Sequence, residues 1–408
     1  MRSLSYIMQA IWHLALHRRT GMGTGYACVL LCFSSCEREP LLHLYDSAEA
    51  EFNLPMVNLD LQVYWDYEVG FDANYDWRSE WNYGWDETDR AIFGEIGYTE
   101  PKVFNLRRYY TGSIPRGPHT MVTPATIEGS SYQGRFEWGF WDLLVWNQVY
   151  TLDGIQSLHF DEASSLDSVV AYTNASMMSS RYQAPRFTHA FYEPETLFAA
   201  YDTAIEINRN LDGFVYVPER NMYVRMLDMT LLPVTYIYLT QVILRHNNGR
   251  VLAIDGNANL SGMARTTTLN TGVAGEDPIT VYYRARMKTG LTIEHPVSGT
   301  VMGETADIVG GRLLSFGLCR QAANHISRAE EVTDNQRHYM DLTMQFSNGI
   351  DSMLVFDVTD QVRRRYKGGV ITVVLDMDTI PTPTRQGGSA FDAVVKDIED
   401  GGTYEFEM

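Results

Sequence analysis

The stretch Val57-Asn58-Leu59-Asp60-Leu61-Gln62-Val63-Tyr64-Trp65 alternates apolar and polar side chains with a period of two. Successive side chains of a β-strand point to opposite faces of its sheet. A period of two therefore predicts a strand with one buried face and one face toward solvent. This is the clearest strand signature in the first half of the chain, and it sets the fold class that we expect.

Runs of the same style recur along the chain, and clusters of Gly, Asn, Asp and Pro separate them. They cover residues 102–110, 136–149, 167–173, 280–287 and 339–346, with a near-continuous apolar run at 370–375. Many short strands between turn clusters, without regular alternation of strand and helix, predict an all-β sandwich or barrel. We expect one short helix at 360–366, and residues 193–207 fit either helix or strand.

A shift in composition divides the chain. The Trp residues that follow the N-terminal region all lie between Trp65 and Trp146, and none occurs later. The stretch 208–221 contains Gly213, Pro218 and several charges, which favours a linker. We therefore expect two β-sandwich domains, at 51–215 and 216–408, and a chain of 408 residues is long enough to build two cores.

The N-terminus has the features of an export signal. Residues 1–35 contain no acidic side chain, and the basic cluster at 17–19 is followed by a short apolar run and then by Ser34-Ser35-Cys36. The apolar run is far shorter than the roughly 20 residues that a transmembrane helix needs. We expect a signal peptide at 1–35, lipidation of Cys36 as in a bacterial lipobox, and a flexible tether at 36–50.

Cysteine content and charge narrow the range of functions. Once the signal is removed and Cys36 carries a lipid, Cys319 is the remaining thiol, so no intramolecular disulfide is possible. The formal net charge of −19 disfavours nucleic acid as a partner, because an acidic surface repels phosphate.

Motifs for catalysis and for metal binding are absent from the sequence. There is no nucleophile elbow, Walker loop or paired Cys motif, and the His residues lack ligand spacing. Asp255-Gly256-Asn257 begins like a calcium loop, but Leu260 and Thr266 stand where Gly and Glu are needed, which favours a hairpin turn. We expect no enzyme, no cofactor and no metal.

Segment 64–87 mixes aromatic and acidic side chains. Aromatic faces stack on sugars and carboxylates accept sugar hydroxyls, so a glycan-binding patch at Trp77, Trp81, Tyr83 and Trp85 is one hypothesis. The alternative is an acidic loop whose aromatic side chains cover the sandwich or a neighbour. Paired carboxylates that hydrolyse glycosides are a third and weaker hypothesis.

Several short segments of the sequence resemble the fimbrillin-like anchor and accessory lipoproteins of Bacteroidales. They are Ser34-Ser35-Cys36, Leu232-Pro233-Val234-Thr235-Tyr236, residues 258–264, residues 313–317 and residues 356–362. The resemblance implies two tandem transthyretin-like, Greek-key β-sandwich domains with a few short helices, and a lipid anchor in the outer membrane. It also implies a role in pilus anchoring or cell adhesion.

In that family, shaft subunits lose an N-terminal strand by cleavage after Arg and accept a strand from the next subunit, which is β-augmentation. No Arg of the first domain clearly follows the first predicted strand, which favours the anchor or accessory type. The C-terminal residues 404–407 are interpreted as a closing strand.

These observations lead to two functional hypotheses. The first is a lipid-anchored, surface-exposed structural or adhesion protein that pairs β-strands with fimbrial subunits or contacts a ligand on a host or cell surface. The alternative is a surface lipoprotein that binds glycans through segment 64–87.

Overall fold

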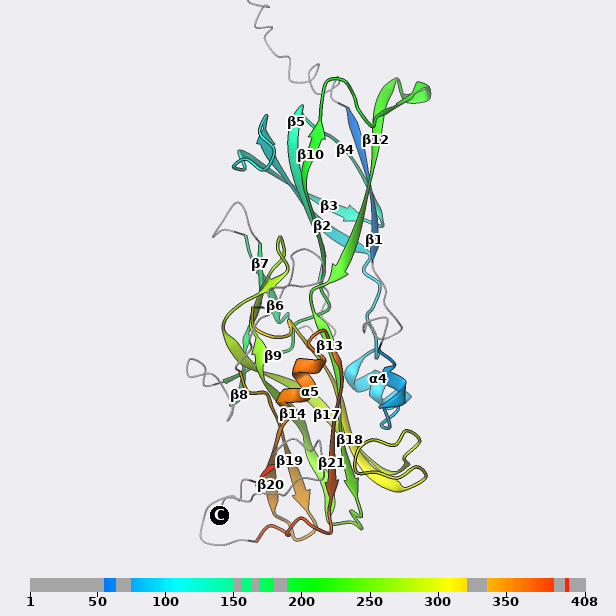
Figure 1. Ribbon diagram of the computed structural model, residues 1–408, viewed down its shortest axis with the longest axis vertical. Coiled ribbons are helices and arrows are strands. Elements are labelled where there is room, and N and C mark those ends of the chain that lie inside the picture. The colour runs from blue at the N-terminus through cyan, green and yellow to red at the C-terminus, as the bar shows by residue number, and fades with distance from the viewer. Residues whose placement is uncertain are drawn as a thin grey trace, which may run out of the picture. The chain divides into compact units, whose positions relative to one another are not determined.

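The computed structural model describes residues 55–63, 75–149, 156–162, 169–179, 189–320 and 336–384, and the backbone of 393–395 (Figure 1). Cys36, the signal peptide, the tether and the C-terminal residues 404–407 lie outside these ranges. Strands dominate the described residues and the α-helices are short, so the predicted all-β class is confirmed. No helix among these residues is long and apolar enough to cross a membrane.

The first sheet has the strand order β3-β2-β5-β10-β12-β1-β4, and β11 pairs with β12. Its strands are β1 (Met56–Val63), β2 (Val103–Gly112), β3 (Met121–Glu128), β4 (Ser131–Arg135), β5 (Gly139–Asn147), β10 (Phe198–Ile207), β11 (Val215–Val217) and β12 (Met222–Pro233). The alternating residues 57–63 lie in β1, as predicted, and residues 64 and 65 lie outside the described ranges. β1 runs parallel to β12 and antiparallel to β4, so it is an interior strand.

The first sheet curls around its own core. Val57, Leu59 and Leu61 of β1 share one apolar cluster with Phe104 of β2 and Trp141 of β5. Strands from distant places in the sheet order therefore contribute to the same interior. The odd-numbered residues of β1 face this interior and the even-numbered residues face outward, as the period of two requires.

The second sheet has the order β21-β13-β18-β17-β14-β19-β20-β22, and β8 and β9 join it at β17. Its strands are β8 (Ala175–Ser179), β9 (His189–Tyr192), β13 (Tyr236–Arg245), β14 (Val251–Ala264), β17 (Pro278–Thr292), β18 (Thr305–Ser315), β19 (Tyr339–Phe346), β20 (Asp351–Asp357), β21 (Gly369–Asp376) and β22 (Ala393–Val395). A small third sheet has the order β16-β15-β7-β6, from β6 (Leu158–Asp161), β7 (Val170–Thr173), β15 (Thr266–Thr268) and β16 (Val273–Ala274).

One side of the second sheet is buried on both faces. Tyr238 and Val242 of β13 point into the main core, whereas Ile237, Leu239 and Ile243 point into a separate apolar cluster on the opposite face. β21 divides its side chains in the same way, which explains why its sequence is an almost continuous apolar run. The second cluster is completed by residues from segment 75–98.

Within the described ranges, four short helical segments connect these strands: η2 (Trp77–Ser79), α4 (Glu87–Phe93), η3 (Pro218–Arg220) and α5 (Thr359–Arg364). The helix predicted at 360–366 is α5, although it begins one residue earlier and its N-cap is Val358. Residues 193–207, which fitted either helix or strand, contain strand β10.

One local prediction was wrong. Asp255-Gly256-Asn257 is no hairpin turn but an irregularity inside β14, where the register with β19 shifts between Ile254 and Ala258. The predicted linker 208–221 contains β11 and η3. The division of the chain into domains at 215 and 216 stays a proposal, and both strands of the β11–β12 hairpin pair within the first sheet.

Candidate functional site

Segment 75–98, which we call the strap, carries the four aromatic residues predicted to bind glycans. It lies on the outer face of the second sheet, and Figure 1 shows its helix α4 beside the strands of that sheet. The side chains of Trp77, Trp81 and Tyr83 are only 7%, 6% and 1% exposed, and Trp85 is half-buried. They pack against apolar residues of β13 and β18.

Burial of these rings bears directly on the glycan hypothesis. A ring that stacks on a sugar must offer an open face, whereas the rings of Trp77, Trp81 and Tyr83 are covered by the sheet and only Trp85 is half-buried. The indole N–H groups of Trp81 and Trp85 donate to the carbonyls of Gly84 and Gly94, within the strap itself. The arrangement matches the alternative interpretation, in which aromatic side chains of an acidic loop cover the sandwich.

A glycine in β18 makes room for the most deeply buried ring. A Cβ atom built on Gly310 would lie 2.4 Å from the ring of Tyr83, far inside van der Waals contact. Any other residue at this position would push the ring off the sheet. The strap and β18 are therefore fitted to each other.

Side-chain amides hold the backbone of the strap as a neighbouring strand would. Gln241 of β13 accepts a hydrogen bond from the backbone N–H of Asn82 and donates one to the carbonyl of Glu80. Asn82 in turn accepts from the N–H groups of Glu294 and His295 and donates to the carbonyl of His295. At the end of the strap, Tyr98 donates to the carbonyl of Thr235.

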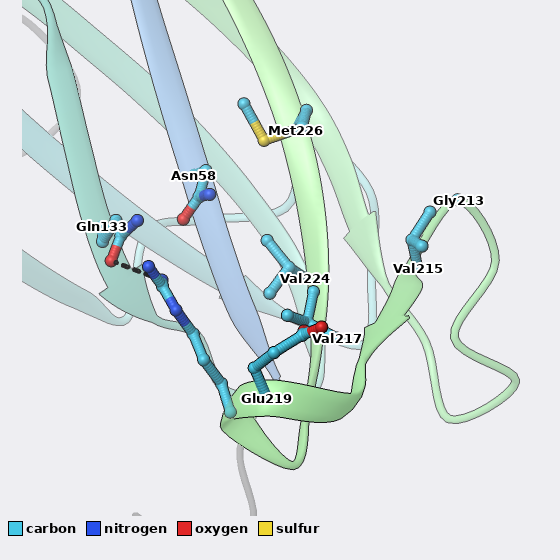
Figure 2. A pocket seen from close by; sticks show the side chains of 9 residues that line it. Asn58, Gln133, Gly213, Val215, Val217, Glu219, Val224 and Met226 are labelled. Atoms are coloured by element: carbon cyan, nitrogen blue, oxygen red, sulfur yellow. Dashed lines mark hydrogen bonds between the residues drawn. The ribbon is translucent and has the colours of Figure 1, made fainter.

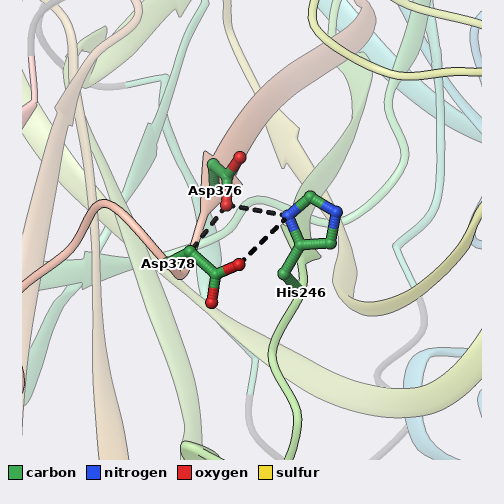
Figure 3. A group of neighbouring side chains, drawn as sticks. All are labelled: His246, Asp376 and Asp378. Atoms are coloured by element: carbon green, nitrogen blue, oxygen red, sulfur yellow. Dashed lines mark hydrogen bonds and ion pairs between the residues drawn. The ribbon is translucent and has the colours of Figure 1, made fainter.

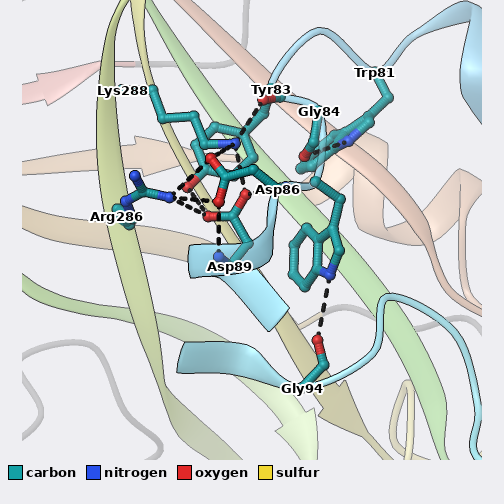
Figure 4. A network of polar contacts seen from close by, with 9 residues as sticks. Trp81, Tyr83, Gly84, Asp86, Asp89, Gly94, Arg286 and Lys288 are labelled. Carbon is teal, nitrogen blue, oxygen red and sulfur yellow. Dashed lines mark hydrogen bonds and ion pairs between the residues drawn. The ribbon is translucent and has the colours of Figure 1, made fainter. Parts of the chain in front are cut away.

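A network of charges closes the strap at α4 (Figure 4). Asp89 is completely buried and accepts hydrogen bonds from Lys288 at 2.6 Å, from Arg286 at 2.8 Å and from the hydroxyl of Tyr83 at 2.9 Å. Asp86 and Asp89 also form a capping box at the start of α4. Two cations of β17 thus face two carboxylates of the strap.

The contacts of this network shift the pKa values of its members. The hydrogen bond from the backbone N–H of Asp89 lowers the pKa of Asp86, and Lys288 lowers it further. Burial raises the pKa of Tyr83, and the neighbouring Asp89 carboxylate adds to this effect. Both carboxylates contact Arg286 and Lys288 of β17.

A second group of titratable residues lies at the end of β13 (Figure 3). His246, Asp376 and Asp378 have oxygen and nitrogen atoms within 4.8 Å of one another. His246 Nδ1 lies 2.9 Å from Asp376, and the hydrogen bond with this carboxylate raises the pKa of His246. Arg245 lies 3.9 Å from Asp376 and pairs more closely, at 2.7 Å, with a third carboxylate, Glu304.

A groove is present on the outer face of the first sheet, and the sequence analysis missed it (Figure 2). It has a volume of about 640 Å³ and lies where β11 and η3 curl over β12, β1 and β4. Its apolar wall is formed by Val215, Val217, Val224 and Met226. Its polar side chains are Asn58, Gln133, Glu219 and Arg220, and Arg220 donates to Gln133. Apolar residues at alternate positions of 215–217 and 222–226 could have indicated this groove. The charged residues between the two runs made the segment resemble a linker.

Comparisons with known proteins give structural relatives only. No protein-family model and no curated protein match the chain. Among solved structures, a candidate adhesin from Bacteroides ovatus shares 12% identity at a TM-score of 0.44, with 82% of this chain and 96% of that chain covered. The fimbrial anchor protein Mfa2 from Porphyromonas gingivalis shares 10% identity at a TM-score of 0.37, with 78% and 90% covered.

A third structure, described as a candidate polysaccharide-binding protein from Bacteroides thetaiotaomicron, shares 8% identity at a TM-score of 0.40, with 79% of this chain and 91% of that chain covered. The names of the adhesin and of the fimbrial anchor protein agree with the group of proteins that the sequence resembles, and the third name describes sugar binding instead. At such identities and TM-scores the likeness assigns no function by itself.

Proposed function

We propose that this chain is a lipid-anchored structural or adhesion protein of the outer cell surface. In this proposal the lipid on Cys36 holds it in the outer membrane, and it serves as a fimbrial anchor or accessory component that pairs β-strands with partner subunits. The role has no catalytic step.

The position of β1 is the observation that carries the proposal. β1 begins at Met56, close behind the proposed tether, and pairs along eight residues with β12 and along five with β4. A pull on the tether along β1 loads both ladders at once, so many backbone hydrogen bonds share the force. A strand with neighbours on both edges and three core side chains is a suitable attachment point for a membrane anchor.

The sheet edges support the strand-pairing part of the proposal. Among the described residues, β3 pairs only with β2 and β4 pairs only with β1, so each has one edge available. Backbone groups at such an edge can take a strand from a partner by β-augmentation.

The anchor is tested by comparing wild type with Cys36→Ala and with the matched control Cys319→Ala. We expect labelled palmitate in the wild type and in the control, and none in Cys36→Ala, which should also leave the membrane fraction. Cells that carry Cys36→Ala should retain fewer fimbriae than cells with the control. Palmitate on the Cys36→Ala protein, or unchanged membrane retention, would refute the anchor.

The burial of the strap's aromatic side chains argues against the alternative function, which is glycan binding. A glycan array probed with the mature protein tests it independently of the lipid. Saccharide retention that is lost on changing half-buried Trp85 to Ala, with the fold intact, would favour this alternative.

A further inference from the structure

The outer face of the first sheet carries an unbalanced pair of carboxylates next to the groove. The even-numbered residues of β1 and β12 face outward, and Asp60 is the register partner of Asp228. Neighbouring strands lie about 4.8 Å apart, so these two acidic residues stand side by side. Neither forms an ion pair with any residue that the structure describes.

Like charges at paired positions of a sheet are destabilising. In the α4 network, by contrast, Arg286 and Lys288 of the same chain neutralise the two carboxylates. The cation of the groove, Arg220, donates to Gln133 and forms no ion pair with Asp60 or Asp228 among the described residues, so this pair can take a cation from outside the chain.

The groove lies directly beside this pair. Asn58 and Met226 are register partners in the row next to Asp60 and Asp228, two residues earlier on each strand. Met226 is 59% exposed and Val215 is 69% exposed, so apolar surface faces solvent here. The Asn58 Oδ1 atom is buried and accepts no hydrogen bond in the described part of the chain, which leaves an unsatisfied acceptor at the groove.

We propose that this face binds an extended segment of a partner protein in which an apolar side chain is followed two residues later by Lys or Arg. Residues i and i+2 of a strand lie on one face about 7 Å apart, which is also the spacing between the Met226 row and the Asp228 row. The apolar side chain fills the groove beside Val224, and the cation lies between the two carboxylates. Opposite charge selects the partner and its register.

This inference deepens the proposed function, because it names the face and the chemistry of a partner, but its test does not depend on the lipid. The probe is a fluorescent peptide that alternates Thr with Val and Lys, compared with one that has Glu in place of Lys. Both are titrated against the full chain carrying Cys36→Ala, and binding is followed by fluorescence anisotropy.

We expect the Lys peptide to bind and the Glu peptide to bind far more weakly. The double variant Asp60→Asn, Asp228→Asn should lose about tenfold in affinity, as two lost surface ion pairs imply. Glu128→Gln, which removes an exposed charge on β3 of the same sheet, is the matched control and should leave affinity unchanged.

Met226→Ser should weaken binding of the Lys peptide without changing its dependence on salt. Because Asn is isosteric with Asp and relieves repulsion, the double variant should unfold at a higher urea concentration than the parent, which also shows that it is folded. Absence of binding by the parent, equal binding of the two peptides, or an equal loss in the Glu128→Gln control would overturn the proposal.

Discussion

At the scale of single residues, Asp89 is the side chain on which the strap most depends. A buried carboxylate is costly unless charge and hydrogen bonds compensate it. Here Lys288, Arg286 and the hydroxyl of Tyr83 do so. Replacing Asp89 with Ala leaves two cations of β17 without their buried partner.

We therefore expect Asp89→Ala to lower the free energy of unfolding by about 3 kcal/mol, measured by urea denaturation. The control is Glu95→Gln, which removes the ion pair between Glu95 and Arg90. The side chain of Arg90 is 52% exposed and that of Glu95 is 66% exposed. That change should cost about 0.5 kcal/mol or less. Equal effects of the two variants would contradict the role given to Asp89.

His246 gives a prediction about pH. The hydrogen bond with Asp376 raises the pKa of His246, and the same contact lowers the pKa of Asp376. A His whose pKa is higher in the folded state stabilises the fold fully below its unfolded pKa of 6.5. That contribution is lost as the pH rises through the folded value.

An NMR titration of the ring should therefore give His246 a pKa above 6.5. Asp376→Asn should move it back toward that ordinary value. A pKa that Asp376→Asn leaves unchanged would mean that Asp376 does not cause the shift.

At the scale of elements, the outer edge of β21 is covered by side chains. Gln361 of α5 accepts from the backbone N–H of Thr372 at 2.9 Å and donates to its carbonyl at 2.8 Å. The hydroxyl of Tyr75 accepts from the N–H of Val370 at 3.0 Å. These contacts occupy backbone groups that an open edge would offer to another chain.

We expect Gln361→Leu to expose the edge at Thr372 and to cause self-association that increases with protein concentration. Light scattering after size-exclusion chromatography measures this. Gln62→Leu places the same apolar side chain on the exposed face of β1 without freeing an edge, and it should remain at the size of the parent. Association of both variants alike would assign the effect to surface hydrophobicity.

The elements that could be predicted from the sequence are strands whose pattern of apolar residues lies within one short segment. The alternation at 57–63 and the apolar run at 370–375 each reflect which faces of one strand are buried, and both appear as strands β1 and β21. β14 was harder, because its bulge places Gly256 at a φ of +87° inside a strand, where the sequence imitates a turn.

The strap could not be placed from sequence, because its contacts are distant along the chain. Asn82 and Gln241 are 159 positions apart, and no periodicity in segment 75–98 indicates that a sheet will cover its aromatic side chains. The same composition fits an exposed glycan patch and a buried cover. Only the three-dimensional placement of β13 and β18 reveals that Trp77, Trp81 and Tyr83 are buried.

At the scale of the whole molecule, the chain leaving β1 reaches the second sheet through the strap. β1 is fixed between β4 and β12, and the strap is fixed to β13, β17 and β18 by the amide contacts, the charge network and the buried rings. Each of these attachments is made by residues outside 64–74. A break in the chain between β1 and the strap should therefore leave both in place.

A specific protease site introduced at 68–69 tests this. After cleavage we expect the N-terminal fragment to co-elute with the rest of the molecule in native buffer and to separate only in denaturant. Leu59→Asp, which places a charge in the core beneath β1, should release the fragment without denaturant, because an unpaired buried carboxylate costs several kcal/mol. Prompt release from the parent would show that β1 is exchangeable, and the tether would then be joined to the molecule by the covalent chain alone.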